Sequence, residues 1–284
     1  MIYLVFALNF LLMIVMPLIL ARFIAARRAA PWSLFGIGAV IFVVSQIGHI
    51  PFNWLILERW ELVPTDTTVL SSLIIYALFL GLSAGVFEEG ARYLTYRFWA
   101  KDARTWGKGL MLGAGHGGIE AILLGLSGII NIGALALIQR GMFLDAIPPE
   151  QMPLVEQQIT AVFSTPLPAI LLGAVERLFA LCAHLAMSLL VMQVFVRGQI
   201  RWLLASILWH TLLNATAVIA ITTWNAYVTE AIIGVFALLS VAIIFWLRTP
   251  EPVEPELEPL PEMKPLQAAD IEATAETLER SKYT

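Results

Sequence analysis

The strongest constraint on this 284-residue chain is a series of long apolar blocks. Seven blocks are long enough to cross a bilayer as helices, which takes about 20 apolar residues each. They cover roughly residues 2–24, 33–56, 69–98, 108–138, 168–196, 202–222 and 226–247. Hydrophobic residues make up 59% of the chain and charged residues only 13%. The sequence therefore predicts an all-α, polytopic transmembrane helical bundle of about seven spans.

Basic residues between the blocks predict the orientation of the chain. They follow the first, third and fifth blocks, as Arg22, Arg27 and Arg28, then Arg97, Lys101, Arg104 and Lys108, then Arg197 and Arg201. The alternate loops, 57–68 and 141–168, contain few Lys and Arg residues. Because short cytoplasmic loops carry an excess of positive charge, we expect the N-terminus outside and the C-terminus in the cytoplasm.

The composition changes after the last block. Residues 248–284 are rich in Pro and Glu and hold too few apolar residues to bury a core. We expect a disordered acidic cytoplasmic tail over 248–284 and a transmembrane helical domain over 1–247.

Ionisable side chains within the apolar blocks are few, and several of them fall into groups with helical spacing. The groups are Glu88, Glu89 and Arg92 in the third block, His116 and Glu120 in the fourth, Glu176, Arg177 and His184 in the fifth, and His210 with Asn214 in the sixth. Spacings of four and seven place residues on one helix face. Ionisable groups inside a membrane usually face the bundle interior or a water-filled cavity. Each group is therefore a candidate site.

The depths of these side chains agree with one another. At about 1.5 Å per residue from the basic flanks, the following positions lie roughly 12 to 20 Å deep: Glu89, His116, Glu120, His184, His210 and Asn214. His49 lies about 24 Å deep or more by the same count, so we place it outside this layer. Its segment, 45–53, is nevertheless polar enough to line a cavity. We expect a site formed by the third to sixth spans.

These residue types suit hydrolysis. A carboxylate in a low dielectric can take a proton from water, histidine can share that role or bind a metal, and His and Asn donors can stabilise an oxyanion. Adjacent glutamates point about 100° apart on a helix, so at most one of Glu88 and Glu89 faces the reacting water. Glu88 lies four residues before Arg92, a spacing that favours an ion pair between them. Glu176 and Arg177 are expected to form a structural ion pair.

The order of these motifs resembles the YhfC family of intramembrane metalloproteases. The motifs are E-E-x-x-R at 88–92, H-x-x-x-E at 116–120, R-x6-H at 177–184 and H-x-x-x-N at 210–214. That family is similar to PrsW-type proteases and to the wider superfamily of CAAX proteases and bacteriocin-processing enzymes. The wider pattern is E-E-x-x-x-R, F-x-x-x-H and H-x-x-x-N or D, on a helical core with a cytoplasm-facing cavity. The resemblance covers roughly residues 80–220, which we expect to form the catalytic core with a cytoplasm-accessible site. It implies a peptide hydrolase in the cell membrane of a bacterium, acting on a membrane-associated peptide or protein.

The resemblance also implies roles for individual residues. Glu88 or Glu89, together with His184, would activate water, and His210 and Asn214 would be oxyanion donors or metal ligands. The metal shell that we expect consists of His116, Glu120, His184 and His210. Such a set could hold zinc with an open position for water, although a glutamate and histidine pair could also act without metal.

Two departures from the superfamily pattern leave one assignment open. Arg92 is one residue closer to the glutamates than in the CAAX pattern, and Phe179 precedes His184 by five residues instead of four. Either His116 or His184 can be the middle histidine. His116, among glycines, and Asn214 could also be interhelical hydrogen-bonding groups, because small residues let helices approach closely.

Other chemistries fit the residues less well. H-E-x-x-H is absent, and Asp occurs only at positions 66, 102, 145 and 270, outside the spans or at their edges. G-x-S-x-G at 81–85 lacks the strand and turn that this motif requires. The alternatives from other classes are a transporter or channel that relays ions through Glu, His and Arg, and a non-catalytic relative of the protease fold. No nucleic-acid partner is expected.

Overall fold

The computed structural model describes residues 1–250 and Glu279, so nearly all of the predicted acidic tail lies outside the described residues. Within 1–250, seven helices are long and apolar enough to cross a membrane, and this part of the chain contains no strand. The predicted all-α bundle of seven spans is confirmed.

The spans begin and end within a few residues of the predicted blocks. They are α1 (Ile2–Arg28), α2 (Trp32–Trp54) with the π-helical turn Leu55–Arg59, α3 (Leu70–Leu94) with the π-helical turn Thr95–Trp99, α4 (Trp106–Gln139), α6 (Leu167–Ile170) leading into α7 (Leu172–Arg197), α8 (Arg201–Thr223) and α9 (Ala226–Trp246). The connection from α4 to α6 contains the short 3-10 turns Leu144–Ala146 and Pro149–Gln151 and the helix α5 (Met152–Phe163).

Local capping signals set several helix ends. The Thr105 hydroxyl accepts a hydrogen bond from the backbone N–H of Lys108 (3.4 Å) at the start of α4. The Asn225 side chain accepts from the N–H of Tyr227 (3.0 Å) at the start of α9. Both satisfy donors that a helix N-terminus leaves unpaired. Helix α7 ends at Gly198, whose φ of 67° is the left-handed conformation that glycine adopts easily.

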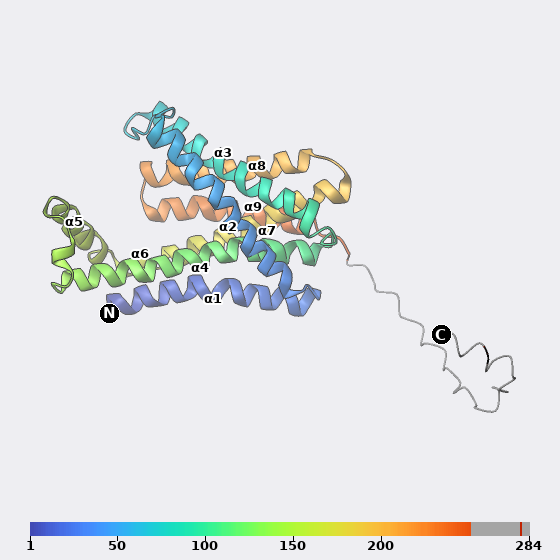
Figure 1. The fold of residues 1–284 in the computed structure, drawn as a ribbon, viewed down its shortest axis with the longest axis horizontal. Helices are drawn as coiled ribbons and strands as arrows, with labels where there is room; N and C mark the ends of the chain where they lie inside the picture. The colour runs from blue at the N-terminus through green and yellow to red at the C-terminus, as the bar shows by residue number, and fades with distance from the viewer. Residues whose placement is uncertain (251–278, 280–284) are drawn as a thin grey trace. The chain divides into compact units, whose positions relative to one another are not determined.

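The helices pack as pairs around α4 and α7 (Figure 1). Helix α1 runs along α4, α2 crosses α4 and reaches α3, and α3 packs on α8. Helix α7 contacts α4, α8 and α9, and 72% of its most apolar 18-residue window is buried. Side chains from α3, α4, α7 and α8 can therefore meet at one place inside the bundle.

Glycine permits a close approach of α2 to α4. At Gly38 in α2, a Cβ atom would lie 2.8 Å from the backbone nitrogen of His116 in α4. Glycine is required there because any side chain would separate the two backbones.

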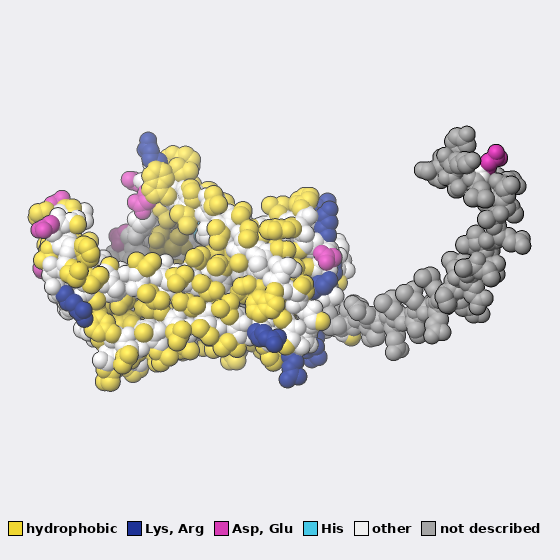
Figure 2. All heavy atoms as spheres, turned by 60° about the horizontal axis from the view of Figure 1, so that its bottom comes forward, with side chains coloured by type: hydrophobic (Ala, Val, Ile, Leu, Met, Phe, Trp, Pro, Cys, Tyr) yellow, Lys and Arg dark blue, Asp and Glu magenta, His cyan; other side chains and the backbone are white. Residues whose placement is uncertain are grey.

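The largest hydrophobic cluster lies at the end of the bundle that carries the basic loops. Most of its buried members come from the last turns of α1, α7 and α9, the π-helical turn after α3, and the first turns of α2, α4 and α8. They include Ile24, Leu34, Tyr96, Trp106, Leu189, Met192, Trp202, Ile244 and Leu247. Most Lys and Arg side chains in Figure 2 gather at one end of the molecule, while its sides are hydrophobic. The apolar sides suit contact with lipid.

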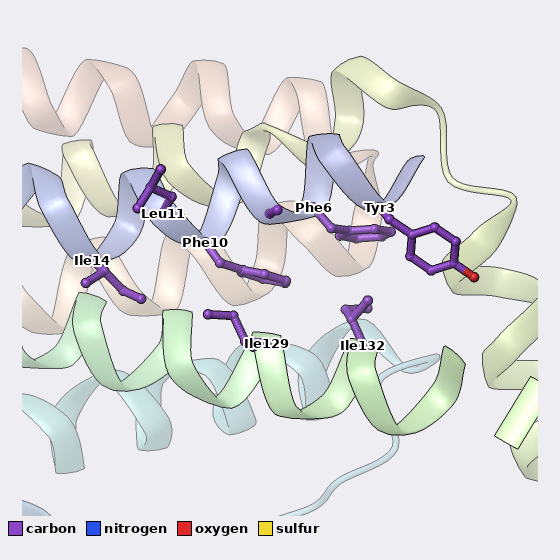
Figure 3. Close-up of a pocket in the computed structure, with 8 residues that line it drawn as sticks. Tyr3, Phe6, Phe10, Leu11, Ile14, Ile129 and Ile132 are labelled. Atoms are coloured by element: carbon purple, nitrogen blue, oxygen red, sulfur yellow. The ribbon is translucent and has the colours of Figure 1, made fainter. Parts of the chain in front are cut away.

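An apolar groove of about 440 Å³ lies between α1 and α4. In Figure 3, Phe6 and Phe10 of α1 point toward Ile129 and Ile132 of α4. Tyr3 is the one titratable residue in its lining, so the groove offers no combination of groups for hydrolysis.

Candidate active site

The polar side chains of four spans converge inside the bundle in two hydrogen-bonded groups, which together we call the network. One group pairs Glu88 of α3 with His116 of α4. The other joins Glu89 and Arg92 from α3, Glu120 from α4, Arg177 and His184 from α7, and Ser206 and His210 from α8. Most of them are buried. Helical spacing predicted which residues face inward, and the packing of the helices brings them together.

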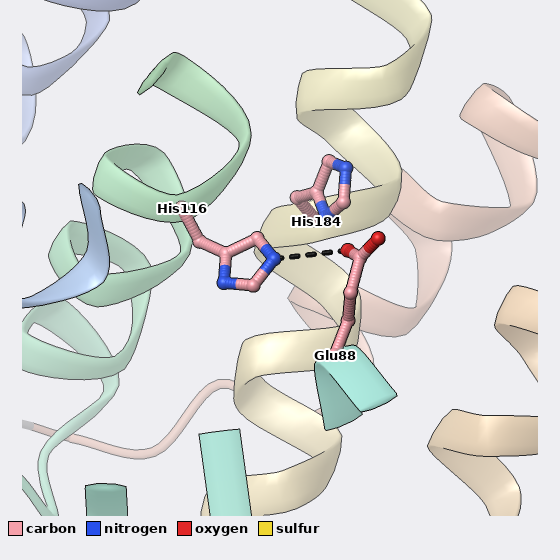
Figure 4. Close-up of side chains that lie close together, drawn as sticks. All are labelled: Glu88, His116 and His184. Carbon is pink, nitrogen blue, oxygen red and sulfur yellow. Dashed lines mark hydrogen bonds and ion pairs between the residues drawn. The ribbon is translucent and has the colours of Figure 1, made fainter. Parts of the chain in front are cut away.

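Glu88, His116 and His184 form the tightest cluster (Figure 4). Each offers one ligand atom, and these atoms lie within 4.8 Å of one another. Glu88 Oε2 and His116 Nε2 are 3.0 Å apart, and the two imidazole rings are separated by 5.2 Å between centroids. The Nδ1 atom of His116 is buried and has no hydrogen-bond partner. A carboxylate and two imidazoles thus face one another in a nearly dry environment.

Gly117 makes room for this cluster. A Cβ atom on Gly117 would lie 2.7 Å from the Cδ2 atom of the His184 ring and 2.8 Å from its Cβ atom. The glycine-rich stretch of α4 therefore determines how closely α7 brings His184 to His116.

Glu89 faces a different direction from Glu88. Its carboxylate forms an ion pair with Arg92, accepts a hydrogen bond from Ser206 Oγ (2.7 Å) and contacts His210 Nδ1 (3.0 Å). The predicted pairing of Arg92 with Glu88 is therefore wrong. The divergence of adjacent side chains on a helix explains this, because Glu88 points toward α2 and α4 while Glu89 points toward α8.

Glu120 connects two basic groups of α7. Its carboxylate accepts from Arg177 Nη1 (2.7 Å) and lies 2.7 Å from His184 Nε2. Arg177 also forms the predicted ion pair with Glu176. A carboxylate bonded to a histidine fixes the tautomer and the orientation of the ring.

Helix α2 contributes residues outside the predicted site. Gln46 Nε2 donates to Glu88 Oε1 (3.1 Å), and Gln46 Oε1 lies 3.1 Å from His49 Nδ1. His49 is outside the cluster, as its depth predicted, but it is linked to Glu88 through Gln46. The polarity of 45–53 was the available signal for these residues. Ser206 on α8 gave no signal, because one serine is common in an apolar helix.

A cavity of about 90 Å³ adjoins the network and has room for several water molecules. Its lining includes Glu88, Glu120, Glu176, Arg177, His184, His210 and Asn214. Asn214 has no hydrogen bond to another described side chain, and its predicted role stays a prediction.

The cavity lies on the side of the network away from the basic loops. The exposed fraction of the side chain is 0% at Glu89, 23% at Glu120 and 41% at Glu176. The prediction was access from the side of the basic loops. The cavity lining instead extends from Glu88 toward Glu176 and Ala217, away from those loops.

Comparison with known proteins assigns the family. The family model described as YhfC intramembrane metalloprotease matches residues 12–237. The chain belongs to the YhfC family. It is 33% identical over 241 residues to the "Uncharacterized membrane protein YhfC" of Bacillus subtilis (strain 168), an alignment covering 82% of this chain and 90% of that relative. No solved structure matches the chain significantly.

The YhfC family match extends further than the motifs indicated. Residues 12–237 include α2 with Gln46 and His49, as well as every residue of the network and the cavity. The chain is therefore an integral membrane protein of a family described as intramembrane metalloproteases.

The YhfC family name implies a metal, and the chemistry of the cluster fits one. One carboxylate and two histidines make a common protein ligand set of catalytic zinc, which leaves a position open for water. Arg92 donates to His184 Nδ1 (2.9 Å), because arginine has no acceptor, so His184 Nε2–H donates to Glu120. Both ring nitrogens of His184 are thus occupied, and binding of a metal at this ring would displace one partner.

Proposed function

We propose that this protein is an intramembrane peptidase that hydrolyses peptide bonds with water activated beside Glu88, His116 and His184. The convergence of these three side chains next to a polar cavity is the observation that carries the proposal. The family description supports the general kind of activity.

Glu88, His116 and His184 are the residues that would hold a metal ion such as zinc. A zinc ion held there would polarise a water molecule and lower its pKa toward neutrality. The site proposed from the structure shares His116 and His184 with the predicted shell and replaces Glu120 and His210 with Glu88.

The chain's own residues position the reacting groups. Gln46 holds the Glu88 carboxylate by donating to its Oε1 atom. Glu120 accepts the Nε2–H proton of His184 and fixes that ring. Glu89 has three partners and no exposed surface, so we assign it to positioning, and Glu88 to the carboxylate that faces water.

His210 and Asn214 act on the substrate from α8. Glu89 accepts the Nδ1–H proton of His210, which directs Nε2 to act as the other proton-transfer atom of a residue that lines the cavity. His210 Nε2 can then take a proton from the attacking water and pass it to the leaving amine. The Asn214 amide suits donation to the developing oxyanion.

Metal content of the purified protein tests the metal site. We expect about one zinc per chain in the wild type and loss of most of it in His116→Ala and Glu88→Ala. His49→Ala is the matched control, because His49 is a histidine outside both candidate ligand sets. His210→Ala separates the two sets: it retains zinc if Glu88 completes the site and loses zinc if His210 is a ligand.

A folded wild-type protein that binds no divalent metal, even after incubation with zinc, would remove the metal from the proposal. Folding is checked by size-exclusion chromatography in detergent for each variant.

Peptide hydrolysis is tested by incubating the purified protein with detergent-solubilised membranes and mapping new peptide termini by mass spectrometry. Termini that appear with the wild type and are absent with Glu88→Gln support the proposal. The transporter alternative predicts instead that Glu88→Gln abolishes ion flux into proteoliposomes and that no new termini form.

A further inference from the structure

We propose that substrates reach the candidate site from the face of the membrane opposite the basic loops, which the charge pattern predicts to be extracytoplasmic. The substrate would then be an extracytoplasmic segment of a membrane-associated peptide or protein. This substrate class rests on the proposed peptidase function, whereas the side of access rests on packing alone.

Packed side chains separate the basic loops from the network. The large hydrophobic cluster draws most of its residues from the ends of all seven spans that lie nearest Arg28, Arg97, Lys108, Arg197 and Arg248. Side chains such as Met111, Leu112 and Leu189 have no exposed surface, and interiors of this kind are close-packed. A groove of about 480 Å³ at this end lies between α1, α4 and α9, and no residue of the network lines it.

Two hydrogen bonds link helices between the network and the basic loops. Tyr96 OH lies 2.9 Å from Ser188 Oγ, and Ser188 Oγ donates to the backbone oxygen of Gly109 (2.8 Å). Tyr96 and Ser188 are both fully buried. Together they join the ends of α3, α4 and α7 between the network and the basic loops.

The hydrophobic packing beside the polar cavity is small. The second hydrophobic cluster of the described residues has four buried members, Ala183, Met187, Leu213 and Ile233, and three of them line the cavity. The polar cavity lies here, and its lining continues to Glu176 and Ala217. The surface in Figure 2 is hollowed toward the end away from the gathered Lys and Arg side chains.

Distances along the helices agree with this direction. His184 lies 13 residues before Arg197, or about 20 Å along α7, and Glu176 lies 21 residues before it, or about 32 Å. The hydrocarbon core of a bilayer is about 30 Å thick. Glu176, the most exposed charged residue of the cavity lining, is therefore near the far surface of the membrane.

Thiol accessibility tests the proposal without requiring catalysis. Cys182 is the one cysteine of the chain, so Cys182→Ala gives a cysteine-free background for Ala217→Cys, which lies in the cavity lining. A membrane-impermeant, small cationic methanethiosulfonate is applied to spheroplasts and to inside-out vesicles. Remaining thiols are then counted after denaturation with a polyethylene glycol maleimide.

Two cysteines in loops serve as references for the two sides of the membrane. Thr65→Cys lies in the loop between α2 and α3, and Gln199→Cys lies in the basic loop between α7 and α8. We expect Ala217→Cys to react at least tenfold faster from the side that modifies Thr65→Cys, and that side to be the outside of the cell.

Three results would overturn the proposal: faster reaction of Ala217→Cys from the Gln199 side, no reaction from either side, or modification of Gln199→Cys from outside the cell. If the proposed peptidase function is wrong, no cleavage will be found, but Ala217→Cys will still react as expected. The two failures are therefore distinguishable.

Discussion

At the scale of single residues, two adjacent glutamates have different surroundings. Glu88 contacts Gln46 and His116 and lines the cavity, whereas Glu89 is enclosed by Arg92, Ser206 and His210. Removing one partner of a buried ion pair is costly because it leaves an uncompensated charge. The two residues should therefore respond differently to the same substitution.

Glu89→Gln should destabilise the protein, by roughly 3 kcal/mol, because Arg92 would lose its buried counter-charge. Glu88→Gln should abolish hydrolysis with little change in stability, because Glu88 has no arginine partner. Thermal denaturation in detergent measures the stability of the two variants, and the cleavage assay measures their activity. Equal destabilisation of both would contradict the assignment of Glu89 as the positioning residue.

Glu120→Gln should weaken zinc binding by about 10- to 100-fold, the usual effect of losing the carboxylate that orients a ligating histidine. The fold should persist, because Arg177 keeps its ion pair with Glu176. Competition with a zinc chelator measures the affinity. Glu176→Gln is the control, since Glu176 does not contact His184; a similar loss in both variants would speak against a role for the bond between Glu120 and His184.

At the scale of elements, α4 positions two helices through small residues. Gly38 of α2 lies against the α4 backbone, and Gly117 of α4 lies against His184 of α7. Helix α4 thereby places His116 between Glu88 and His184. The glycines that make the fourth block a poor helix former in water serve as contact surfaces inside the bundle.

Gly117→Ala should lower stability by about 1 to 3 kcal/mol, because an added methyl group forces a packed interface apart, and should abolish hydrolysis by moving His184. Gly133→Ala on the same helix has open space around the added carbon and should be tolerated. Thermal denaturation and cleavage are measured for both. A fully active Gly117→Ala enzyme would show that the contact with His184 is not required.

At the scale of the whole molecule, charge and packing are polarised along the spans. The basic loops and the large hydrophobic cluster lie at one end, and the lining of the polar cavity extends toward the other. The orientation of this arrangement in the membrane, with the N-terminus outside, stays a prediction from the positive-inside rule. The division into a membrane domain over 1–247 and a tail over 248–284 also stays a prediction.

Reporter fusions should establish the orientation. A green fluorescent protein joined to the C-terminus should fluoresce, because it folds in the cytoplasm, and alkaline phosphatase inserted after Thr65 should be active, because it folds outside. The converse insertion after Gln199 is the control and should be inactive. An active phosphatase at Gln199 would reverse the orientation and with it the predicted side of substrate entry.

The sequence by itself determined the membrane class, the seven spans and most members of the polar network. Apolar block length and helical spacing are local properties, so they are readable without the fold. The same reasoning identified Glu88, His116 and His184 as inward-facing residues, and it supported the family that the comparison then established.

Only the tertiary structure decided how these residues pair. Arg92 binds Glu89 and His184, Gln46 of α2 reaches Glu88, and Ser206 of α8 joins the network, because the rotation and crossing of helices bring together groups far apart in sequence. The direction of the cavity was decided in the same way. Hydropathy locates each span, but which end of a bundle is filled depends on the side chains of all seven helices together.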